Sequence, residues 1–211
     1  MDEPIRTGAD MKTILFYGDS NTYGYDPRGF GGGRYPKDVR WTDRLAEVSG
    51  GEWKVLVNAM NGREIPDRER SAGSVLEMIG TAAAAHAQLR FAVMLGTNDL
   101  FSAGRFSPAM TVSRKMSQFL DRIRNAFPEM PVLMIAPPPI GAADAIDPEE
   151  QRLYRESRQL SLLYHILAEQ KGLDFASAFD WQVPLAFDGV HLSEEGHDAF
   201  FEHMRDVLED Y

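Results

Sequence analysis

The stretch Ile14-Leu15-Phe16-Tyr17-Gly18-Asp19-Ser20-Asn21, near the start of the chain, decides the fold. Four apolar residues in succession are typical of a strand that is buried on both faces, as strands of parallel sheets are. The run then stops at a glycine followed by three small polar residues, which bury poorly. We therefore expect a buried strand that ends in a turn, with Ser20 presented where the strand passes into a helix.

Strand-like and helix-like segments continue to alternate along the chain. Short apolar runs occupy residues 13–17, 53–57, 91–95, 132–136 and 173–179. Segments with helical periodicity lie between and after them, at residues 41–49, 72–89, 109–127, 148–171 and 193–208. Strands that alternate with helices and are apolar on both faces form a parallel sheet covered by helices on each side. The sequence therefore predicts a doubly wound α/β sandwich.

Three of the predicted helices begin with a capping signal. Ser107 and Asp147 each precede a proline, and Ser193 precedes two glutamates. Serine and aspartate side chains accept hydrogen bonds from the free amides of a first helical turn, and proline fits the first helical position. We expect all three side chains to cap their helices.

The size of the chain favours a single domain. Its 211 residues are 44% hydrophobic, which is enough to close a sizeable core, and no linker-like change of composition interrupts them. We expect one domain over residues 11–211, preceded by a disordered extension at residues 1–10.

Charge and composition exclude several kinds of partner. The net charge of −10 repels the phosphates of nucleic acids and anionic lipid surfaces, so we expect neither nucleic acid nor membrane as a partner. No apolar run approaches the ~18–20 residues that span a bilayer. The N-terminal residues lack the apolar region of a secretory signal. With no cysteine, the chain forms no disulfide, which fits a reducing compartment. We expect a soluble, cytoplasmic protein.

Small and polar residues follow the predicted strands, where the strands end. In an open parallel sheet, ligands bind outside the carboxyl ends of the strands, because the loops converge there. Each cluster taken alone also fits a turn or a helix cap. The clusters are Gly18-Asp19-Ser20-Asn21, Asn61-Gly62, Gly96-Thr97-Asn98-Asp99 and, before the last helix, Asp188-Gly189-Val190-His191.

Together these clusters contain the groups that acyl-ester hydrolysis requires. The reaction needs a nucleophile, a base, a group that orients the base, and donors for the oxyanion. Ser20 supplies a hydroxyl, His191 an imidazole, and Asp188 a carboxylate within reach of that ring. The backbone amides of Ser20 and Gly62 and the side chain of Asn98 are candidate oxyanion donors. This set requires no cofactor and no metal.

The four clusters resemble the four blocks of the SGNH hydrolases, also called the GDSL lipase/esterase superfamily, in the same chain order. The resemblance implies a flavodoxin-like three-layer α/β/α sandwich with a five-stranded parallel sheet. It also implies that Ser20 is the nucleophile and that His191 is the base, oriented by Asp188. Gly62 and Asn98 then complete the oxyanion hole with the Ser20 amide.

A narrower resemblance is to the bacterial arylesterase/acyltransferase branch, through residues 18–25, 39–42, 94–99 and 136–139. It implies a serine esterase that hydrolyses short-chain esters of aryl or simple alkyl alcohols through an acyl-enzyme. It also implies acyl transfer to other alcohols and a homo-oligomer. This chain departs from the family at one position: Asn21 stands where the L of the name GDSL denotes a leucine. We expect this difference to affect substrate preference more than the chemistry of the reaction.

Other functions remain open at this point. A carbohydrate O-deacetylase would use the same four blocks. A metal-dependent hydrolase could use Asp19, Asp99, Asp188 and His191, although these residues have no familiar ligand spacing. A catalytically silent binding module could keep the same fold. Nucleotide binding is disfavoured, because no G-x-G-x-x-G motif follows the first strand. The α/β-hydrolase fold is disfavoured as well, because the sequence has no G-x-S-x-G motif.

Overall fold

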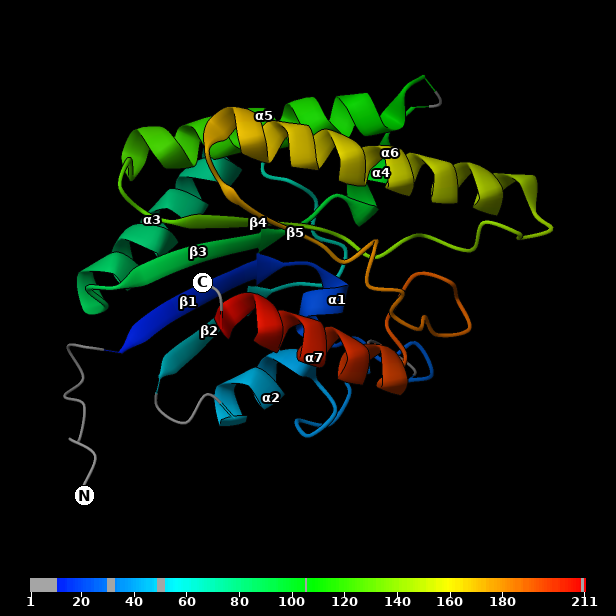
Figure 1. Ribbon diagram of the computed structural model, residues 1–211. Helices are drawn as coiled ribbons and strands as arrows, with labels where there is room; N and C mark the ends of the chain where they lie inside the picture. The colour runs from blue at the N-terminus through cyan, green and yellow to red at the C-terminus, as the bar shows by residue number, and fades with distance from the viewer. Residues whose placement is uncertain (1–10, 30–32, 49–51, 105, 210) are drawn as a thin grey trace.

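The computed structural model describes residues 11–29, 33–48, 52–104, 106–209 and 211. The extension predicted at residues 1–10 lies outside the described residues. The chain forms three layers, with a parallel sheet between two layers of helices (Figure 1). No helix in the described part of the chain is long and apolar enough to cross a bilayer.

The sheet has five parallel strands in the order β2-β1-β3-β4-β5. This order is the flavodoxin-like one, and both the α/β class and the doubly wound arrangement predicted from the sequence are confirmed. Strand β1 pairs with both β2 and β3, and the direction of winding reverses between β1 and β3, so the carboxyl end of β1 faces the expected ligand crevice. The strands are β1 Lys12–Gly18, β2 Trp53–Ala59, β3 Leu89–Met94, β4 Val132–Ala136 and β5 Asp174–Ser177.

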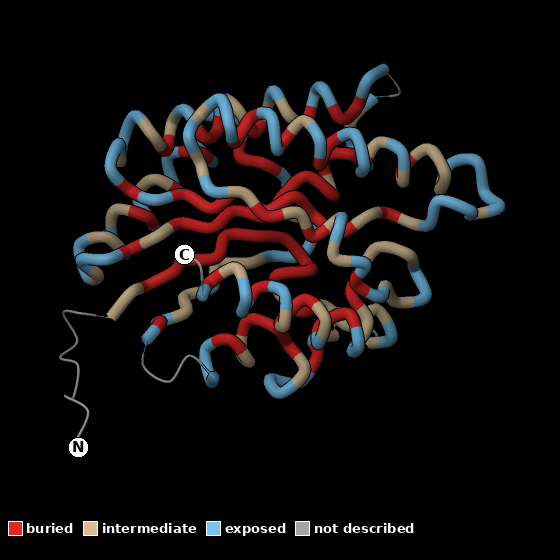
Figure 2. The backbone as a smooth tube through the Cα atoms, viewed as in Figure 1, coloured by how far each residue is buried: buried red, intermediate tan, exposed pale blue. Residues whose placement is uncertain are grey.

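Five longer helices cover the two faces of the sheet. On one face lie α2 Trp41–Val48 and α7 Glu194–Glu209, and on the other lie α3 Glu69–Ala85, α5 Pro108–Ala126 and α6 Pro148–Lys171 (Figure 1). Side chains alternate along β1, so that Ile14 and Phe16 pack toward α2 and α7 while Leu15 and Tyr17 pack toward α3 and α5. The three inner strands β1, β3 and β4 are accordingly almost entirely buried, whereas the edge strands β2 and β5 are more exposed (Figure 2).

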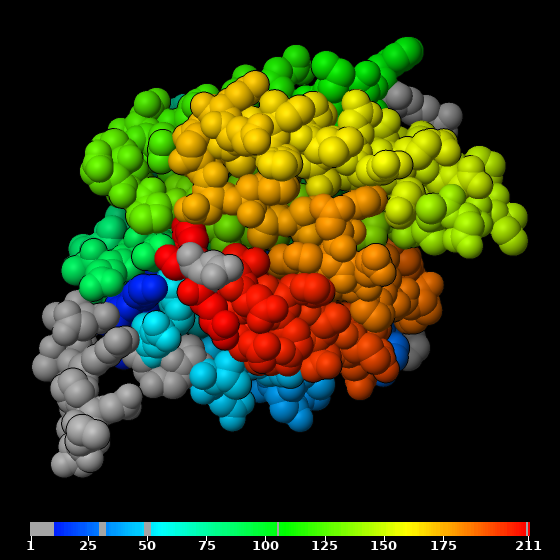
Figure 3. All heavy atoms as spheres, in the orientation of Figure 1, coloured from blue at the N-terminus to red at the C-terminus, as the bar shows by residue number. Residues whose placement is uncertain are grey.

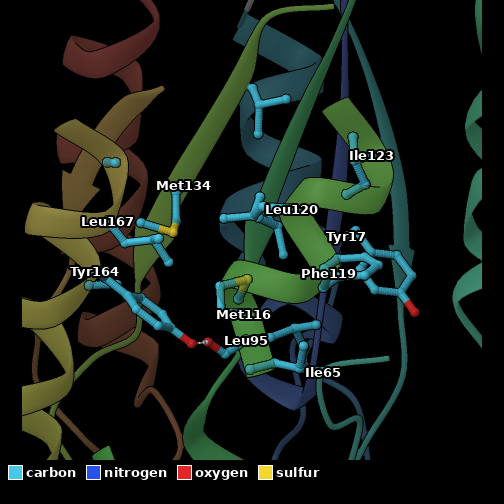
Figure 4. Close-up of a cluster of buried hydrophobic side chains, with 14 of the residues drawn as sticks. Tyr17, Ile65, Leu95, Met116, Phe119, Leu120, Ile123, Met134, Tyr164 and Leu167 are labelled. Atoms are coloured by element: carbon cyan, nitrogen blue, oxygen red, sulfur yellow. Dashed lines mark hydrogen bonds between the residues drawn. The ribbon is translucent and has the colours of Figure 1, made fainter. Parts of the chain in front are cut away.

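The larger of the two cores lies under α5 and α6 (Figure 4). The predicted stripe of α5 is buried, with Met116, Phe119 and Ile123 each at most 1% exposed. The Tyr164 hydroxyl of α6 donates to the Leu95 carbonyl at 3.1 Å, which fixes α6 against the end of β3. This packing holds the strand ends rigidly at the edge where the polar clusters lie.

Two short helices differ from the prediction. The sequence pattern did not indicate α1, Ser20–Tyr23, or α4, Thr97–Ser102. Four and six residues are too few to show a helical period. Each of these helices begins within a polar cluster, so the clusters form first helical turns as well as strand-to-helix loops.

The helix predicted at 72–89 lies earlier in the chain than expected. Helix α3 starts at Glu69 and ends at Ala85, and Leu89 already belongs to β3.

Two of the three predicted helix caps are present. The Asp147 side chain accepts a hydrogen bond from Glu149 N at 3.0 Å, and the Ser193 side chain accepts one from Gly196 N at 3.0 Å. Ser107 does not cap α5. Its φ of 47° is left-handed and its side chain makes no capping bond, while Glu156 accepts from the Ala109 amide at 3.0 Å instead.

Candidate active site

The Gly18-Asp19-Ser20-Asn21 cluster places Ser20 at the start of α1, directly beyond β1. Asp19 caps this helix, since its carboxylate accepts a hydrogen bond from Asn21 N at 3.0 Å. Ser20 is 6% exposed, so the surrounding residues cover most of its surface. The sequence prediction that Ser20 stands at a strand-to-helix turn is confirmed.

The fold brings His191 to Ser20, although the two residues are 171 positions apart in the chain. The distance from His191 Nε2 to Ser20 Oγ is 3.0 Å, and the distance from His191 Nδ1 to Asp188 Oδ2 is 2.7 Å. The three side chains therefore form a continuous chain of hydrogen bonds. The half-buried ring of Tyr25 lies against the imidazole, with 4.6 Å between the ring centroids.

The second carboxylate oxygen of Asp188 holds the local backbone. Asp188 Oδ1 accepts from Val190 N and from His191 N, each at 3.0 Å. Burial alone would raise the pKa of Asp188, but the hydrogen bonds from the His191 ring and from these two amides outweigh it and lower the pKa. An ionised Asp188 accepts a hydrogen bond from Nδ1–H of the His191 ring, which leaves Nε2 free to accept the Ser20 hydroxyl proton.

The loop that carries Asp188 and His191 connects β5 to α7 and is anchored at several points. The Gly141 amide donates to Gly189 O at 2.7 Å, and the Ala186 amide donates to His191 O at 2.7 Å. In the space-filling view, this part of the chain, drawn in orange, lies between α6 and α7 (Figure 3). The imidazole is thus presented by a loop that is bound within itself and to the segment that precedes α6.

The two other predicted oxyanion donors, Gly62 and Asn98, lie close together, because the Asn98 side chain bonds to the residue after Gly62. Gly62 follows β2 and has a φ of +71°, a conformation that L side chains rarely adopt. Asn98 Nδ2 donates to the carbonyl of Arg63, the residue after Gly62, at 3.1 Å. It also lies 3.5 Å from Asp19 Oδ2. The side-chain amide of Asn98 is therefore held between the serine turn and the Gly62 loop.

Close packing requires glycine at the turn that leads to Asn98. Gly96 has a φ of +135°, and a Cβ atom there would lie 2.8 Å from Leu160 Cδ2 and 3.0 Å from Tyr164 Oη. Contacts under about 3 Å force neighbouring groups to shift. Glycine thus lets β3 end tightly against α6 and turn α4 toward Ser20.

Lys115, Glu64 and Ile65 hold Asp99 beside this site, and none of the three has a signal in the sequence. Lys115 of α5 donates to Asp99 at 2.6 Å and to Glu64 at 3.1 Å. The Asp99 carboxylate also accepts from Ile65 N, at 3.0 and 3.2 Å to its two oxygens. Because Glu64 and Ile65 closely follow Gly62, this network ties the Gly62 loop to α4 and α5. Lysine in an amphipathic helix ordinarily indicates a solvent-facing position, so its role here emerges only from the fold.

Arg63 and Gly62 both line a groove beside the site. The Arg63 guanidinium donates to Gly18 O at 3.0 Å and to Asn58 O at 2.5 Å, and it lies over the Tyr17 ring at 4.2 Å. This groove, between the Gly62 loop and α3, has a volume of about 590 Å³. Arg63 therefore braces the ends of β1 and β2 beside the site.

Asp19 is the most perturbed acid at this edge. Exclusion of water by burial raises the pKa of Asp19 to about 7; the Asn21 amide opposes the increase and the nearby charge of Asp99 adds to it. In the unfolded chain an aspartate titrates near 3.9. The folded protein therefore keeps a proton on Asp19 in a pH range where the unfolded chain has lost it.

This difference predicts a pH dependence of stability. The contribution of Asp19 to the free energy of unfolding is fully present below about pH 4 and is lost as the pH rises through about 7. Urea denaturation at intervals from pH 4 to pH 8 measures the free energy of unfolding. Between about pH 4 and pH 7, the free energy of unfolding of Asp19→Asn should rise relative to that of the wild type by up to about 1.4 kcal/mol per pH unit. The exposed Asp144→Asn is the matched control. A parallel pH dependence of wild type and Asp19→Asn would contradict the prediction.

Within the described ranges, no three His, Cys, Asp or Glu side chains converge so that they could hold a metal ion. The metal-dependent alternative therefore has no ligand set in this part of the chain.

Comparison with known proteins agrees with this geometry. The sequence model of the GDSL-like lipase/acylhydrolase family matches residues 16–199. A search of the curated proteins found no match. A solved structure assigned as an arylesterase from Agrobacterium tumefaciens has a TM-score of 0.75 and 28% sequence identity, covering 95% of this chain and 99% of that one.

Est24, a carbohydrate acetylesterase from Sinorhizobium meliloti, has a TM-score of 0.74 and 26% identity, covering 94% of this chain and 99% of that one. The aryl esterase of M. smegmatis shares the fold, with a TM-score of 0.72 and 24% identity over 94% and 99% of the two chains. The family match spans all four polar clusters, from the serine turn to the histidine loop. The chain therefore belongs to the GDSL-like lipase/acylhydrolase family, and it is a hydrolase of carboxylic esters.

Proposed function

We propose that this protein is a serine esterase that hydrolyses short-chain esters through an acyl-enzyme. The observation that carries the proposal is the hydrogen-bonded chain from Ser20 Oγ through His191 to Asp188, with distances of 3.0 and 2.7 Å. In this order, the carboxylate fixes the tautomer of the base and the base faces the nucleophile.

The reaction follows from these positions. His191 Nε2 removes the proton of Ser20 as Oγ attacks the ester carbonyl, and Asp188 stabilises the imidazolium that results. The tetrahedral intermediate then collapses, and His191 passes the proton to the leaving alcohol. Water, deprotonated by the same imidazole, attacks the acyl-enzyme and releases the acid and free Ser20.

We assign the oxyanion to three donors, the amides of Ser20 and Gly62 and the side chain of Asn98. Support for Asn98 comes from its position between the serine turn and the Gly62 loop, where its amide is already oriented by Arg63 O at 3.1 Å. Donors that are held in place before the reaction need no reorganisation as charge develops.

Replacing Asn98 by alanine should lower kcat about 10²–10³-fold and leave KM nearly unchanged, because an oxyanion donor acts mainly in the transition state. Steady-state hydrolysis of p-nitrophenyl acetate measures both constants. Asn125→Ala, the same change at an exposed position on α5, is the control and should behave as the wild type. A loss confined to KM would assign Asn98 to substrate binding instead.

For the substrate, we propose acetate or similarly short esters of aryl or simple alkyl alcohols. The Tyr25 ring lies beside the imidazole that protonates the leaving alcohol, and an aromatic ring there favours a flat leaving group. The similarity to a structure assigned as an arylesterase points the same way. A carbohydrate O-deacetylase is the second candidate, favoured by the comparable similarity to Est24.

A substrate series separates the two candidates. We expect kcat/KM to fall from p-nitrophenyl acetate to butyrate to octanoate, and to be higher for phenyl acetate than for acetylated xylose. A preference for the acetylated sugar would favour the deacetylase. Adding benzyl alcohol to the reaction and measuring benzyl acetate tests acyl transfer, which we propose as a second activity. The homo-oligomer and the cytoplasmic location expected from the sequence stay predictions.

A further inference from the structure

Asn21, the second residue of α1, connects the serine turn to the histidine loop. Its side chain is buried, and its residue is 3% exposed. Asn21 Nδ2 donates to Val190 O at 3.1 Å, and Asn21 Oδ1 accepts from Leu192 N at 2.9 Å. These two partners are the residues immediately before and after His191. One carboxamide therefore holds the backbone on both sides of the imidazole.

The orientation of this carboxamide is fixed by its partners. A carbonyl can only accept and an amide N–H can only donate, so a rotated Asn21 side chain would lose both hydrogen bonds. The backbone of Asn21 is fixed as well. Its amide donates to Asp19 Oδ1 at 3.0 Å and its carbonyl accepts from Trp41 Nε1 at 2.9 Å.

The other anchors of the histidine loop hold different parts of it. Gly189 is bound to Gly141, and the Asp188 carboxylate binds within the loop itself. The bonds of Asn21 instead join the loop to the residue that follows Ser20, across 169 and 171 positions of the chain. Leucine, which stands here in the family name, has no group that could make either bond.

We propose that Asn21 is a positioning residue that sets the 3.0 Å approach of His191 Nε2 to Ser20 Oγ. The proposal rests on the proposed function, because the approach matters only if His191 acts as the base of Ser20. The hydrogen bonds of the Asn21 side chain go to the backbone on either side of His191, and neither of them is to Ser20 Oγ or to the His191 ring.

The first test is Asn21→Leu, which keeps a similar volume and removes both bonds. A misplacement of about 1 Å in a catalytic group costs about 10²-fold, so kcat for p-nitrophenyl acetate should fall by about that factor while KM stays within about twofold. Thr22→Val is the matched control. Thr22 is equally buried on the same helix, and its hydroxyl has no hydrogen-bond partner in the structure, so the variant should retain wild-type kcat.

A double-mutant cycle separates positioning from general stability. If Asn21 acts through His191, then Asn21→Leu should cost about 10²-fold in the wild-type background and less than about threefold in a His191→Ala background. An equal loss in both backgrounds, or an unchanged kcat in the single variant, overturns the proposal. If Asn21→Leu does not fold by circular dichroism, Asn21→Ala, which removes the same bonds without adding a branched side chain, is put through the same cycle.

Labelling with a fluorophosphonate distinguishes failure of this proposal from failure of the proposed function. If the wild-type protein is not labelled on Ser20, the proposed function fails and the role of Asn21 fails with it. If the wild type is labelled and Asn21→Leu is labelled at the same rate, only the role of Asn21 is overturned. A labelling rate reduced about 10²-fold in Asn21→Leu, and unchanged in Thr22→Val, supports both.

Discussion

Ser20→Ala should abolish ester hydrolysis and leave the fold intact. Without the Oγ atom no acyl-enzyme can form, so kcat should fall by at least about 10⁴-fold. The hydroxyl bonds to His191 at 3.0 Å, and alanine is well tolerated in a first helical turn, so the thermal midpoint should change little. Hydrolysis of p-nitrophenyl acetate and intact-mass analysis after fluorophosphonate treatment are the two measurements.

Ser71→Ala, an exposed serine on α3, is the control for this experiment and should keep full activity and full labelling. Retained hydrolysis by a pure Ser20→Ala preparation would exclude Ser20 as the nucleophile. EDTA should leave the wild-type kcat unchanged. Inhibition that is reversed by added metal would instead support the metal-dependent alternative.

Asp188→Asn should lower kcat about 10⁴-fold, because it reverses the tautomer of the base. Asp188 uses both oxygens, one for the His191 ring and one for the amides of Val190 and His191. Asparagine has a single oxygen. If that oxygen keeps the two amides, the NH₂ group faces Nδ1 and forces the ring proton onto Nε2, which can then no longer accept the Ser20 proton.

The measurement is kcat and KM for p-nitrophenyl acetate, with the expectation that KM changes little. Asp180→Asn is the matched control, since Asp180 is exposed and lies in the same connection between β5 and α7. A loss below about tenfold for Asp188→Asn would mean that another group orients the imidazole.

The sequence was informative wherever a local pattern carries the structural information. Strand β1 and the turn at Ser20 follow from four apolar residues and a polar stop, and the structure confirms them. The Ser107 cap was wrong because the sequence signal does not include Glu156, which is distant in the chain but occupies the capping role. The helix α4 was missed because its six residues are shorter than two turns.

Contacts between distant segments could not be predicted in the same way. Nothing in the residues around Lys115 indicates that its ammonium group reaches Asp99 and Glu64, since the three belong to separate elements. The departure at Asn21 was visible in the sequence, and we read it there as a matter of substrate preference. In the structure its carboxamide binds the histidine loop, which concerns the geometry of the reacting groups.

The distance between Ser20 and His191 along the chain has a consequence during synthesis. A ribosome that adds about 5–20 residues per second exposes the serine roughly 10–35 s before the histidine. Throughout that interval the nascent chain has a hydroxyl but no base, and it cannot attack the esters around it. Under the proposed mechanism, hydrolysis can therefore begin only after the loop that carries His191 has been translated and has packed against the serine turn.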